Sequence, residues 1–392
     1  MIHSTARIFQ LAAILGCVSS SIYYLLCLWS AAVFLRGRTA GERAHPTLSL
    51  PLPPVSILKP LKGTDPDIYE SFRSHCLQDY PEYEVVFGVS DPDDPAVASV
   101  QQLQREFPER MIRLVVASEK LGANVKVSNL DQMVKVVRYE HLLVNDSDIR
   151  VKPDYLRRVV APLLDQRVGM VTCLYRGLAA PTLGSQLEAL GISTDFCPGV
   201  LVARQLEGGL HFGLGSTLAF RKAELEKMGG FRSIVDFLAD DYELGRRIAD
   251  LGLQVQLSTA VVETHLPAYD LRGFLAHQLR WARGVRDART KGYFGLLTTY
   301  GVMWGLLALI ASCGATWAWA VLGVIVLLRF IVALAVGRVV LEDRQVVRQL
   351  WLLPIRDLFA VVVWFASFAG NTVTWRGDRF ELRKGRLIKI SQ

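Results

Sequence analysis

The sequence predicts an α/β fold, with a mainly parallel sheet covered by helices on both faces, and transmembrane helices at both ends of the chain. Apolar and amphipathic segments alternate between residues 55 and 144, which is the pattern of strands and helices around a parallel sheet. Residues 8–35 and 292–328 contain no charged side chain, and about twenty apolar residues suffice to cross a bilayer. Acidic residues directly follow the apolar segments, at the edge where α/β sheets bind ligands.

The first uncharged run predicts an N-terminal transmembrane anchor, residues 1–36. One basic residue precedes the run and a cluster follows it: Arg7, then Arg36, Arg38, Arg43 and His45. Because basic residues mark the cytoplasmic end of membrane helices, the chain after the anchor is expected in the cytoplasm. A cleaved signal peptide is the alternative interpretation, but the run is longer than a typical signal core and no clear Ala-x-Ala site follows it.

Residues 37–290 are predicted to form one cytoplasmic domain, which begins with a linker of Pro, Gly and charged residues at 37–53. Short apolar segments bounded by turn residues predict four strands, at residues 55–60, 82–90, 111–117 and 142–144. Helical spacing of apolar residues predicts three helices between them, at residues 67–78, 96–107 and 124–137. This order places the ends of successive strands at one edge of the sheet.

Carboxylates follow two of these strands. Asp91, Asp93 and Asp94 come after the second strand, and Asp146 and Asp148 come after the fourth. Two acids at i and i+2 on a turn can face one cation, and Mg²⁺ is commonly held by one or two carboxylates together with phosphate oxygens. The alternative is a loop with solvated acids, since Asp-x-Asp is a common sequence.

A third acidic group and a basic helical stretch come later in the chain. Asp240 and Asp241 precede a helical segment, where acids also favour the helix dipole without any catalytic role. His277, Arg280 and Trp281 lie on a helical stretch that opens near residue 271. An amphipathic basic helix at the membrane surface is the alternative interpretation of that stretch.

Residues 291–392 are predicted to form a C-terminal membrane bundle with a basic tail. As one helix, residues 292–328 would extend roughly 55 Å, against about 30 Å for a bilayer core. The run is therefore expected to fold back near residues 313–316 and to continue past Arg329, which must face the interior or reach the membrane surface. A last apolar segment spans residues 350–373. Four full crossings would separate the tail from the cytoplasmic domain, whereas a re-entrant segment would keep them together.

The overall composition favours a membrane partner over a nucleic acid. The net charge is +7 and 51% of residues are hydrophobic, which suits anionic substrates or membrane surfaces. No basic run is interleaved with aromatic residues, so no nucleic acid is expected. The six cysteines show no metal-binding spacing and are expected to be reduced and structural.

Taken in order, these motifs resemble those of a known enzyme family. Asp91, Asp146-x-Asp148, Asp240-Asp241 and Arg280-Trp281 are similar to the D, DxD, (E/T)D and QxxRW motifs of GT-A glycosyltransferases of family 2 and its relatives. The closest resemblance is to the ceramide glucosyltransferases of family 21. Residues 191–196, 239–247 and 279–283 resemble, more closely still, the bacterial members associated with hopanoid biosynthesis. The resemblance covers nearly the whole chain.

The resemblance implies a GT-A fold and an inverting, metal-dependent transfer. It implies Asp241 as the catalytic base, Asp148 and Asp146 as ligands of Mg²⁺ or Mn²⁺, and Asp91, Lys126, Asn129 and Asp146 as donor-binding residues. His277, Arg280 and Trp281 are implied at the diphosphate and acceptor, with Asp240 and Gly215 in supporting positions. The sequence departs from the family at His277, where Gln or Arg is usual.

The expected activity is therefore transfer of a hexose from a UDP-sugar to the hydroxyl of a membrane lipid. The hexose is glucose or N-acetylglucosamine, and the acceptor is a hopanoid polyol or ceramide; the motifs do not distinguish them. The alternatives are a processive polysaccharide synthase of the same fold and a non-catalytic membrane scaffold with a degenerate domain. The expected location is a multi-pass position in the inner or plasma membrane, with the catalytic domain in the cytoplasm.

Overall fold

A mixed eight-stranded sheet forms the centre of the α/β domain in the computed structural model, which describes residues 2–44, 52–375 and 378–390. The strand order is β3-β2-β1-β4-β7-β6-β8-β5. The bounds are β1 Val55–Pro60, β2 Tyr83–Val89, β3 Met111–Val116, β4 His141–Val144, β5 Ile149–Arg150, β6 Val168–Leu178, β7 Leu218–Arg221 and β8 Gln254–His265. The four strands expected from the sequence are β1 to β4, and they pair in parallel as predicted.

The second half of the sheet contains antiparallel pairs. Strand β7 runs antiparallel to both β4 and β6, while β6 and β8 pair in parallel and β5 pairs antiparallel with β8. Because β7 starts where β4 ends, with Val144 opposite Leu218, the loop before β7 lies beside the residues that follow β4. This pairing brings residues near 215 to the Asp146 turn.

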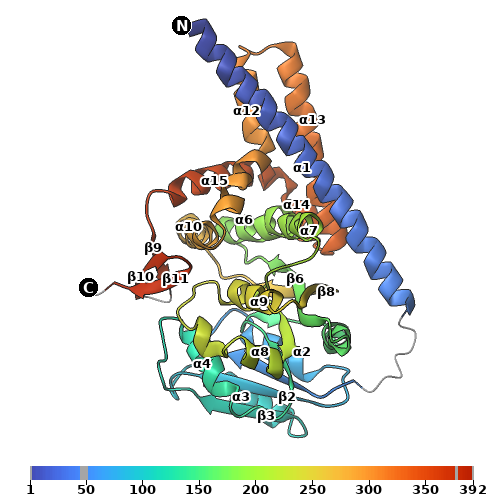
Figure 1. Ribbon diagram of the computed structural model, residues 1–392, viewed down its shortest axis with the longest axis vertical. Coiled ribbons are helices and arrows are strands. Elements are labelled where there is room, and N and C mark those ends of the chain that lie inside the picture. The colour runs from blue at the N-terminus through green and yellow to red at the C-terminus, as the bar shows by residue number, and fades with distance from the viewer. Residues whose placement is uncertain (1, 45–51, 376–377, 391–392) are drawn as a thin grey trace.

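Helices cover both faces of the sheet (Figure 1). Their bounds are α2 Ile68–Cys76, α3 Ala96–Glu106, α4 Val125–Met133, α5 Tyr155–Val160, α6 Leu183–Gly191, α7 Cys197–Leu206, α8 Lys222–Lys227, α9 Asp240–Asp250 and α10 Leu271–Ala288. Short 3₁₀ turns lie at η1 Ala161–Leu164 and η3 Phe231–Ile234, and a π-helical turn, η2 Ile192–Phe196, joins α6 to α7. The three predicted helices are α2, α3 and α4, each shorter than expected.

Three of the described helices are long and apolar enough to cross a membrane. They are residues 7–39 within α1 (Ile2–Ala44), residues 316–340, formed by α13 (Thr316–Val332) and the π-helix η5 (Ala333–Val340), and residues 345–367. A bent pair, with a 55° angle between residues 290–299 and 301–311, would make a fourth. It consists of α11 Thr290–Gly295, η4 Leu296–Thr299 and α12 Gly301–Ala311. The predicted fold-back is confirmed, because α12 ends at Ala311 and α13 begins at Thr316.

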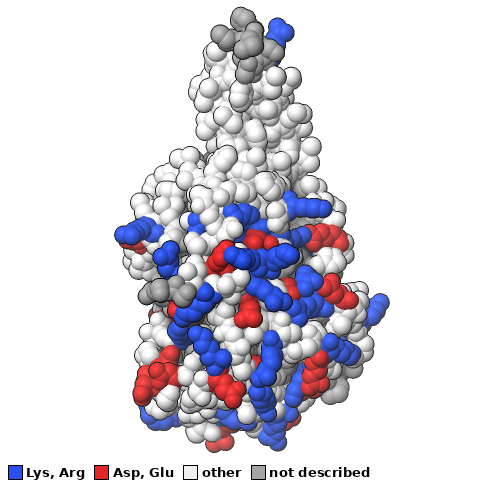
Figure 2. Space-filling view, turned by 60° about the vertical axis from the view of Figure 1, so that its left-hand side comes forward, with Lys and Arg blue, Asp and Glu red and all other residues white. Residues whose placement is uncertain are grey.

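The last apolar stretch consists of α14 (Gln345–Gln349), η6 (Leu350–Leu352) and α15 (Leu353–Ser367). In Figure 1, α15 lies crosswise to α1, α12 and α13, in a layer with α6 and α10 between the membrane helices and the sheet. Figure 2 shows an upper column without charged side chains apart from its tip, and charged residues spread over the broader part below.

Two expectations about the ends of the α/β domain differ from the structure. The segment 37–53 was expected as a linker, but α1 continues to Ala44; residues 45–51, including His45, lie outside the described residues. The helix continues because tertiary contacts support it: Arg38 donates to the Val340 carbonyl at 3.3 Å. The basic tail contains a three-stranded antiparallel sheet of β9 (Thr372–Trp375), β10 (Asp378–Arg383) and β11 (Arg386–Lys389).

Candidate active site

The acidic motifs meet at the amino group of Lys126. Its Nζ lies 2.7 Å from Oδ1 of Asp146 and 3.0 Å from Oδ2 of Asp240. Lys126 stands in the first turn of α4, while Asp146 follows β4 and Asp240 begins α9. Asn124 caps α4 by accepting from the Val127 amide, and its own amide lies 3.4 Å from Asp240. Three predicted residues from three distant segments are thus brought together.

Asp241 lies beside the same cluster. Its carboxylate accepts hydrogen bonds from the Gly215 and Tyr242 amides, both at 2.7 Å. A Cβ at Gly215 would stand 2.9 Å from Oδ2 of Asp146 and 3.3 Å from Oδ2 of Asp241. A larger residue at position 215 would therefore crowd both carboxylates, and Gly215 lies where the sequence analysis expected a supporting residue.

The loop of Gly215 is held against α9 by a second close contact. A Cβ at Gly245 would stand 2.1 Å from the Gly213 nitrogen, so only glycine lets α9 pack on this loop. Gly213 also donates its amide to the Asp241 carbonyl at 3.3 Å. Backbone contacts thus fix where the first turn of α9 presents its acids.

Burial raises the pKa of two of the predicted carboxylates. The pKa of Asp241 rises to about 6, first through burial and then through the charge of Asp240, against the opposing charge of Lys126. The pKa of Asp148 also rises to about 6, through burial and the charge of Asp146. Burial would lower the pKa of Lys126, but the surrounding carboxylates outweigh it and raise that pKa. The site therefore holds an excess of negative charge in a poorly solvated place.

The carboxylates of Asp146 and Asp148 fit a hard divalent cation. The Asp148 carboxylate accepts a hydrogen bond from the Thr264 hydroxyl on β8, which orients it. In the described part of the chain no group of three or more His, Cys, Asp or Glu side chains is arranged around one cation position. A pair of carboxylates such as Asp146 and Asp148 is the kind of donor set that phosphate oxygens complete around Mg²⁺.

A buried lysine that the sequence analysis did not select supports this turn. Lys59, at the end of β1, is fully buried and donates to the Asp146 carbonyl at 3.1 Å. Burial lowers its pKa to about 7, although Asp148 and Asp146 oppose the shift. The sequence does contain an indication of this role, since Lys59 is a charged residue in an apolar segment. An isolated charge in a buried strand requires a partner.

The candidate donor-binding residues that follow strand β2 lie farther along the same edge of the sheet. Asp91 is exposed and accepts from the Asp93 amide at 2.9 Å, whereas Asp94 accepts from the Gly63 amide at 2.9 Å and joins two turns. Strand β1 separates β2 from β4, so these turns are ~10 Å apart at about 4.8 Å per strand. Asn129 is buried on α4 and accepts from the Ser90 hydroxyl at 2.8 Å, directly before Asp91.

The residues of α10 form a second group. His277 stacks on Tyr269 at 5.3 Å and lies 5.9 Å from Trp281, which meets Phe196 edge-on at 5.7 Å. The Nδ1 atom of His277 is 3.2 Å from Oε1 of Glu188 on α6. His277 is therefore engaged with the layer beneath the membrane helices rather than with the acidic cluster.

Tyr269 connects the two groups electrostatically. Burial raises its pKa to about 12, with further raising contributions from Glu188 and Asp148 and a lowering contribution from Arg280. Arg280 thus lies within electrostatic range of a tyrosine that also senses Asp148.

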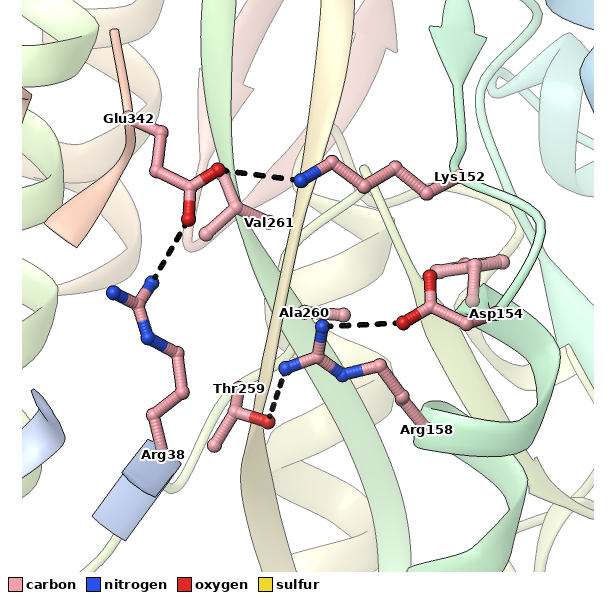
Figure 3. A pocket seen from close by; sticks show the side chains of 9 residues that line it. Arg38, Lys152, Asp154, Arg158, Thr259, Ala260, Val261 and Glu342 are labelled. Carbon is pink, nitrogen blue, oxygen red and sulfur yellow. Dashed lines mark hydrogen bonds and ion pairs between the residues drawn. The ribbon is translucent and has the colours of Figure 1, made fainter. Parts of the chain in front are cut away.

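A small pocket of about 40 Å³ lies elsewhere and contains none of the predicted site residues (Figure 3). It is lined by Arg38, Lys152, Asp154, Tyr155, Arg158, Thr259, Ala260, Val261 and Glu342. A volume of that size holds only one or two water molecules. Its ion pairs, from Glu342 to Arg38 at 3.4 Å and to Lys152 at 3.2 Å, join α1 to the α/β domain.

Known proteins share both the sequence pattern and the fold. The chain is 24% identical over 276 residues to "Ceramide glucosyltransferase 1" of Caenorhabditis elegans, covering 70% of this chain and 58% of that protein. It is 32% identical over 123 residues to "Ceramide glucosyltransferase" of Komagataella phaffii, covering 29% of this chain and 24% of that protein. The chain spans only about half the length of the first two curated relatives.

A solved structure confirms the predicted fold. The mannosyltransferase PcManGT from Pyrobaculum calidifontis, solved in complex with GDP-Man and Mn²⁺, aligns with a TM-score of 0.52 at 21% identity. The alignment covers 91% of this chain and 99% of that one. The family model described as "Glycosyl transferase family 21" matches residues 12–388. The predicted GT-A architecture and family resemblance are thereby confirmed, and the chain belongs to glycosyl transferase family 21.

Proposed function

We propose that this protein transfers a hexose, with inversion, from a UDP-sugar to the hydroxyl of a membrane lipid. The observation that carries the proposal is the cluster in which Asp146, Asp240, Asp241 and Gly215 meet around Lys126. A nucleotide diphosphate, a base and an acceptor must all converge on one anomeric carbon, and this cluster provides the acidic groups for that convergence. The named relatives of the family support a lipid acceptor.

In the proposed reaction Asp241 removes the proton from the acceptor hydroxyl. The acceptor oxygen forms a bond to the anomeric carbon while the bond from that carbon to the phosphate oxygen breaks. The diphosphate leaves with the electron pair, and an α-linked donor yields a β-linked product. A pKa near 6 makes Asp241 a stronger base than an ordinary aspartate while leaving it largely ionised at neutral pH.

Asp148 and Asp146 are the residues proposed to hold Mg²⁺ or Mn²⁺. Such an ion, when bound, stabilises negative charge on the leaving diphosphate as a Lewis acid. The bound Mn²⁺ of the Pyrobaculum calidifontis enzyme supports this assignment. Lys126 forms an ion pair with the Asp146 carboxylate and is proposed to turn toward the phosphate oxygens when the donor binds. Arg280 is proposed to bind the diphosphate as a second cation.

Asp91 and Asn129 are proposed on the nucleoside side, two strands away from the metal-binding turn. His277 and Trp281 are proposed on the acceptor side, because their aromatic layer lies next to the membrane helices. The acceptor is an amphipathic lipid with a hydroxyl at the membrane surface, either ceramide or a hopanoid polyol. The donor sugar is glucose or N-acetylglucosamine.

The catalytic domain is proposed to face the cytoplasm. The basic residues after the first span support that orientation, and a UDP-sugar donor is then available to the site. A processive polysaccharide synthase is the alternative on the same fold, but such enzymes usually carry more spans than the three or four candidates here. A non-catalytic scaffold is the second alternative, and the complete set of acidic motifs argues against it.

The test is transfer by detergent-solubilised full-length protein. Incubation with UDP-glucose or UDP-N-acetylglucosamine, each with ceramide or a hopanoid polyol, should yield one glycolipid that mass spectrometry identifies. Activity should require Mg²⁺ or Mn²⁺ and disappear in EDTA. Release of UDP with formation of a polymer would favour the synthase, and the absence of both hydrolysis and transfer with every donor would favour the scaffold.

A further inference from the structure

The helix α15 carries a continuous apolar stripe on its outer face. The stripe consists of Trp351, in the middle of η6, followed by Ile355, Leu358, Val362 and Phe365 of α15. These side chains are 66%, 41%, 64%, 50% and 57% exposed. Their spacing of four and three residues places them on one side of the helix. An exposed apolar stripe of this length is typical of a surface that contacts a membrane or another protein.

The opposite face of α15 is packed on the α/β domain. Leu353 belongs to a buried cluster with Leu187 of α6 and Phe274 of α10, and the Phe274 ring meets Phe359 edge-on at 5.7 Å. Arg356 is also buried and donates to Gln278 of α10 at 3.0 Å. The helix is therefore seated lengthwise on the domain, with one face covered and one open.

Both ends of the segment are attached to the same domain. At the start, Gln345 donates to the Gly177 carbonyl of β6 at 3.0 Å. At the end, Arg286 of α10 donates to the carbonyls of Ser367 and Gly370, the latter at 3.0 Å. The whole segment 345–367 has 23 residues, which is long enough to cross a bilayer, so its attachments rather than its length decide its placement. A segment fixed at both ends to one domain cannot also cross the bilayer.

The tail that follows α15 stays on this side as well. Leu387 donates its amide to the Asp236 carbonyl at 2.7 Å, and Leu238 donates to the Gly385 carbonyl at 3.1 Å. Both partners belong to the loop directly before Asp240. The chain that leaves α15 therefore returns to the acidic site.

We propose that α15 lies in the plane of the membrane surface, in the leaflet that faces the catalytic domain, with its apolar stripe among the lipids. The chain then crosses the bilayer three times, through α1, through the bent α11–α12 segment, and through α13. The partner is lipid because the stripe is continuous with the membrane-spanning column: α15 lies against α12, and Trp364 stacks on Tyr293 of α11 at 6.1 Å. Figure 2 shows uncharged surface continuing from the column onto the part directly below it.

This arrangement resolves the placement of the tail. With four crossings the tail and the catalytic domain would lie on opposite sides of the membrane, whereas three crossings leave them together. Amphipathic helices with large apolar side chains on one face lie in the membrane interface rather than across it. The proposal does not depend on the identity of the donor or the acceptor.

Spin labels can measure whether α15 lies in the plane of the membrane or crosses it. Single cysteines replacing Trp351, Leu358 and Phe365, in full-length protein without reactive native cysteines, would carry nitroxides in liposomes. Accessibility to oxygen and to a water-soluble nickel chelate should report similar, shallow depths at the three positions. Labels replacing Trp317, Val324 and Ile331, exposed along α13, calibrate a graded crossing.

Two outcomes would overturn the in-plane placement. A crossing helix would shift the depth by about 21 Å from position 351 to position 365. A protein partner on the stripe, such as a second copy, would instead shield all three labels from oxygen and chelate alike and couple labels on neighbouring copies. Reconstituted transfer activity of each labelled variant, or unchanged monodispersity in detergent, confirms that the fold persists.

Sidedness provides an independent test. Cys313 is the exposed cysteine at the α12–α13 turn, and the other described cysteines are buried. Arg167→Cys marks the catalytic domain and Arg383→Cys marks the tail, each in a Cys313→Ser background. A membrane-impermeant maleimide should reach positions 167 and 383 from the same side, and Cys313 of the unmodified protein from the opposite side. Labelling of positions 383 and 313 from one side would refute three crossings.

Discussion

Asp241 and Asp240 are neighbours with different surroundings. Asp240 is paired with Lys126, whereas the Asp241 carboxylate is held by the Gly215 and Tyr242 amides. Asp241→Asn keeps the volume of the side chain and removes its basicity. We expect turnover to fall by about 10²-fold or more, with little change in UDP-sugar affinity measured by calorimetry. Asp240→Asn should have a smaller effect.

The paired variants also test the assignment itself. If Asp240→Asn is inactive while Asp241→Asn turns over normally, the base is the neighbouring residue. If both variants keep full activity, neither carboxylate removes the proton and the inverting base mechanism fails.

The raised pKa of Asp241 sets an acid limit on activity. Burial and the charge of Asp240 raise this pKa to about 6, and only the deprotonated form is a base. Turnover at saturating donor should therefore be constant well above pH 6 and should fall about tenfold per unit well below it. Asp148 titrates in a similar range, but its protonation should weaken donor binding and appear in KM. A turnover number that is unchanged between pH 5 and pH 7 would contradict this role.

Asp148→Ala tests the proposed metal-binding turn. The substitution removes one of the two carboxylates proposed to hold the metal ion, so we expect transfer to disappear. Donor affinity should fall in the presence of Mn²⁺ and change little in EDTA, measured by calorimetry. Asp165→Ala is the matched control, because Asp165 is half-buried, lies outside the candidate site and pairs with nearby Arg167. Equal donor affinity of wild type and Asp148→Ala in Mn²⁺ would remove Asp148 from the site.

At the scale of elements, the C-terminal sheet supports the loop that precedes Asp240 and Asp241. Its turn is tethered by a hydrogen bond from the Gly385 amide to Asp287 of α10. Its face buries Leu382 and Leu387, against which Leu238 packs. The Phe237 ring lies between the guanidinium groups of Arg247 and Arg386, at 5.6 Å and 5.2 Å. The tail is thus part of the framework of the candidate active site.

Asp287→Ala should loosen this framework. Losing a charged acceptor for a backbone amide costs roughly 1.5–3 kcal/mol, so we expect about tenfold lower turnover as the loop before Asp240 loses its fixed position. Faster cleavage of the tail by added protease should accompany the loss. Asp378→Ala serves as the control, since Asp378 pairs with Lys389 within the tail sheet itself. Unchanged turnover in Asp287→Ala, with the tail released, would show that the sheet does not position the loop.

The first half of the sheet could be predicted from the sequence, and the second half could not. Strands β1, β2 and β4 are buried and the edge strand β3 is partly buried, and each appears as an apolar segment closed by turn residues. The antiparallel strand β7 is only four residues long, and the tail strands alternate apolar and charged residues over lengths too short to separate from a basic tail. Their formation depends on long-range contacts, such as Leu387 with Asp236, that no local pattern contains.

The acidic motifs of the sequence include residues that the structure brings together, but their order did not predict how these residues pair. Nothing local to Lys126 indicates that it meets both Asp146 and Asp240, because these three residues come from different segments. The engagement of His277 with Glu188 depends in the same way on the packing of α6 against α10. Lys59 could have been selected from the sequence, because it is the charged residue within the apolar first strand.

At the scale of the whole molecule, a buried ion-pair network joins the membrane helices to the catalytic domain. Arg329 of α13 is 4% exposed and lies 2.7 Å from Asp357 of α15 and 2.5 Å from Asp195 of η2. It also donates to the Thr194 carbonyl at 2.8 Å. The arginine that the sequence placed deep in an apolar run thus faces the protein interior.

Arg329→Met should destabilise the protein strongly. It leaves the Asp357 carboxylate buried without its partner, which costs about 3–5 kcal/mol. Thermal unfolding in detergent should show a clearly lower midpoint. The double variant Arg329→Met/Asp357→Leu should recover much of the loss, because Asp195 keeps Arg356 at 3.4 Å. If the single and double variants are equally unstable, the ion pair is not the cause.

The helix α1 is a single element of 43 residues, about 65 Å long. It passes from the far end of the membrane column down the flank of the catalytic domain (Figure 1). Near its lower end Arg38 is held by Glu342, which also binds Lys152 (Figure 3). The N-terminal helix is therefore a rigid connection rather than a flexible one. It fixes the distance between the acidic cluster and the bilayer. A domain held in this way can reach an acceptor only at the surface of its own membrane, so the lipid acceptor proposed above would have to rise to the site.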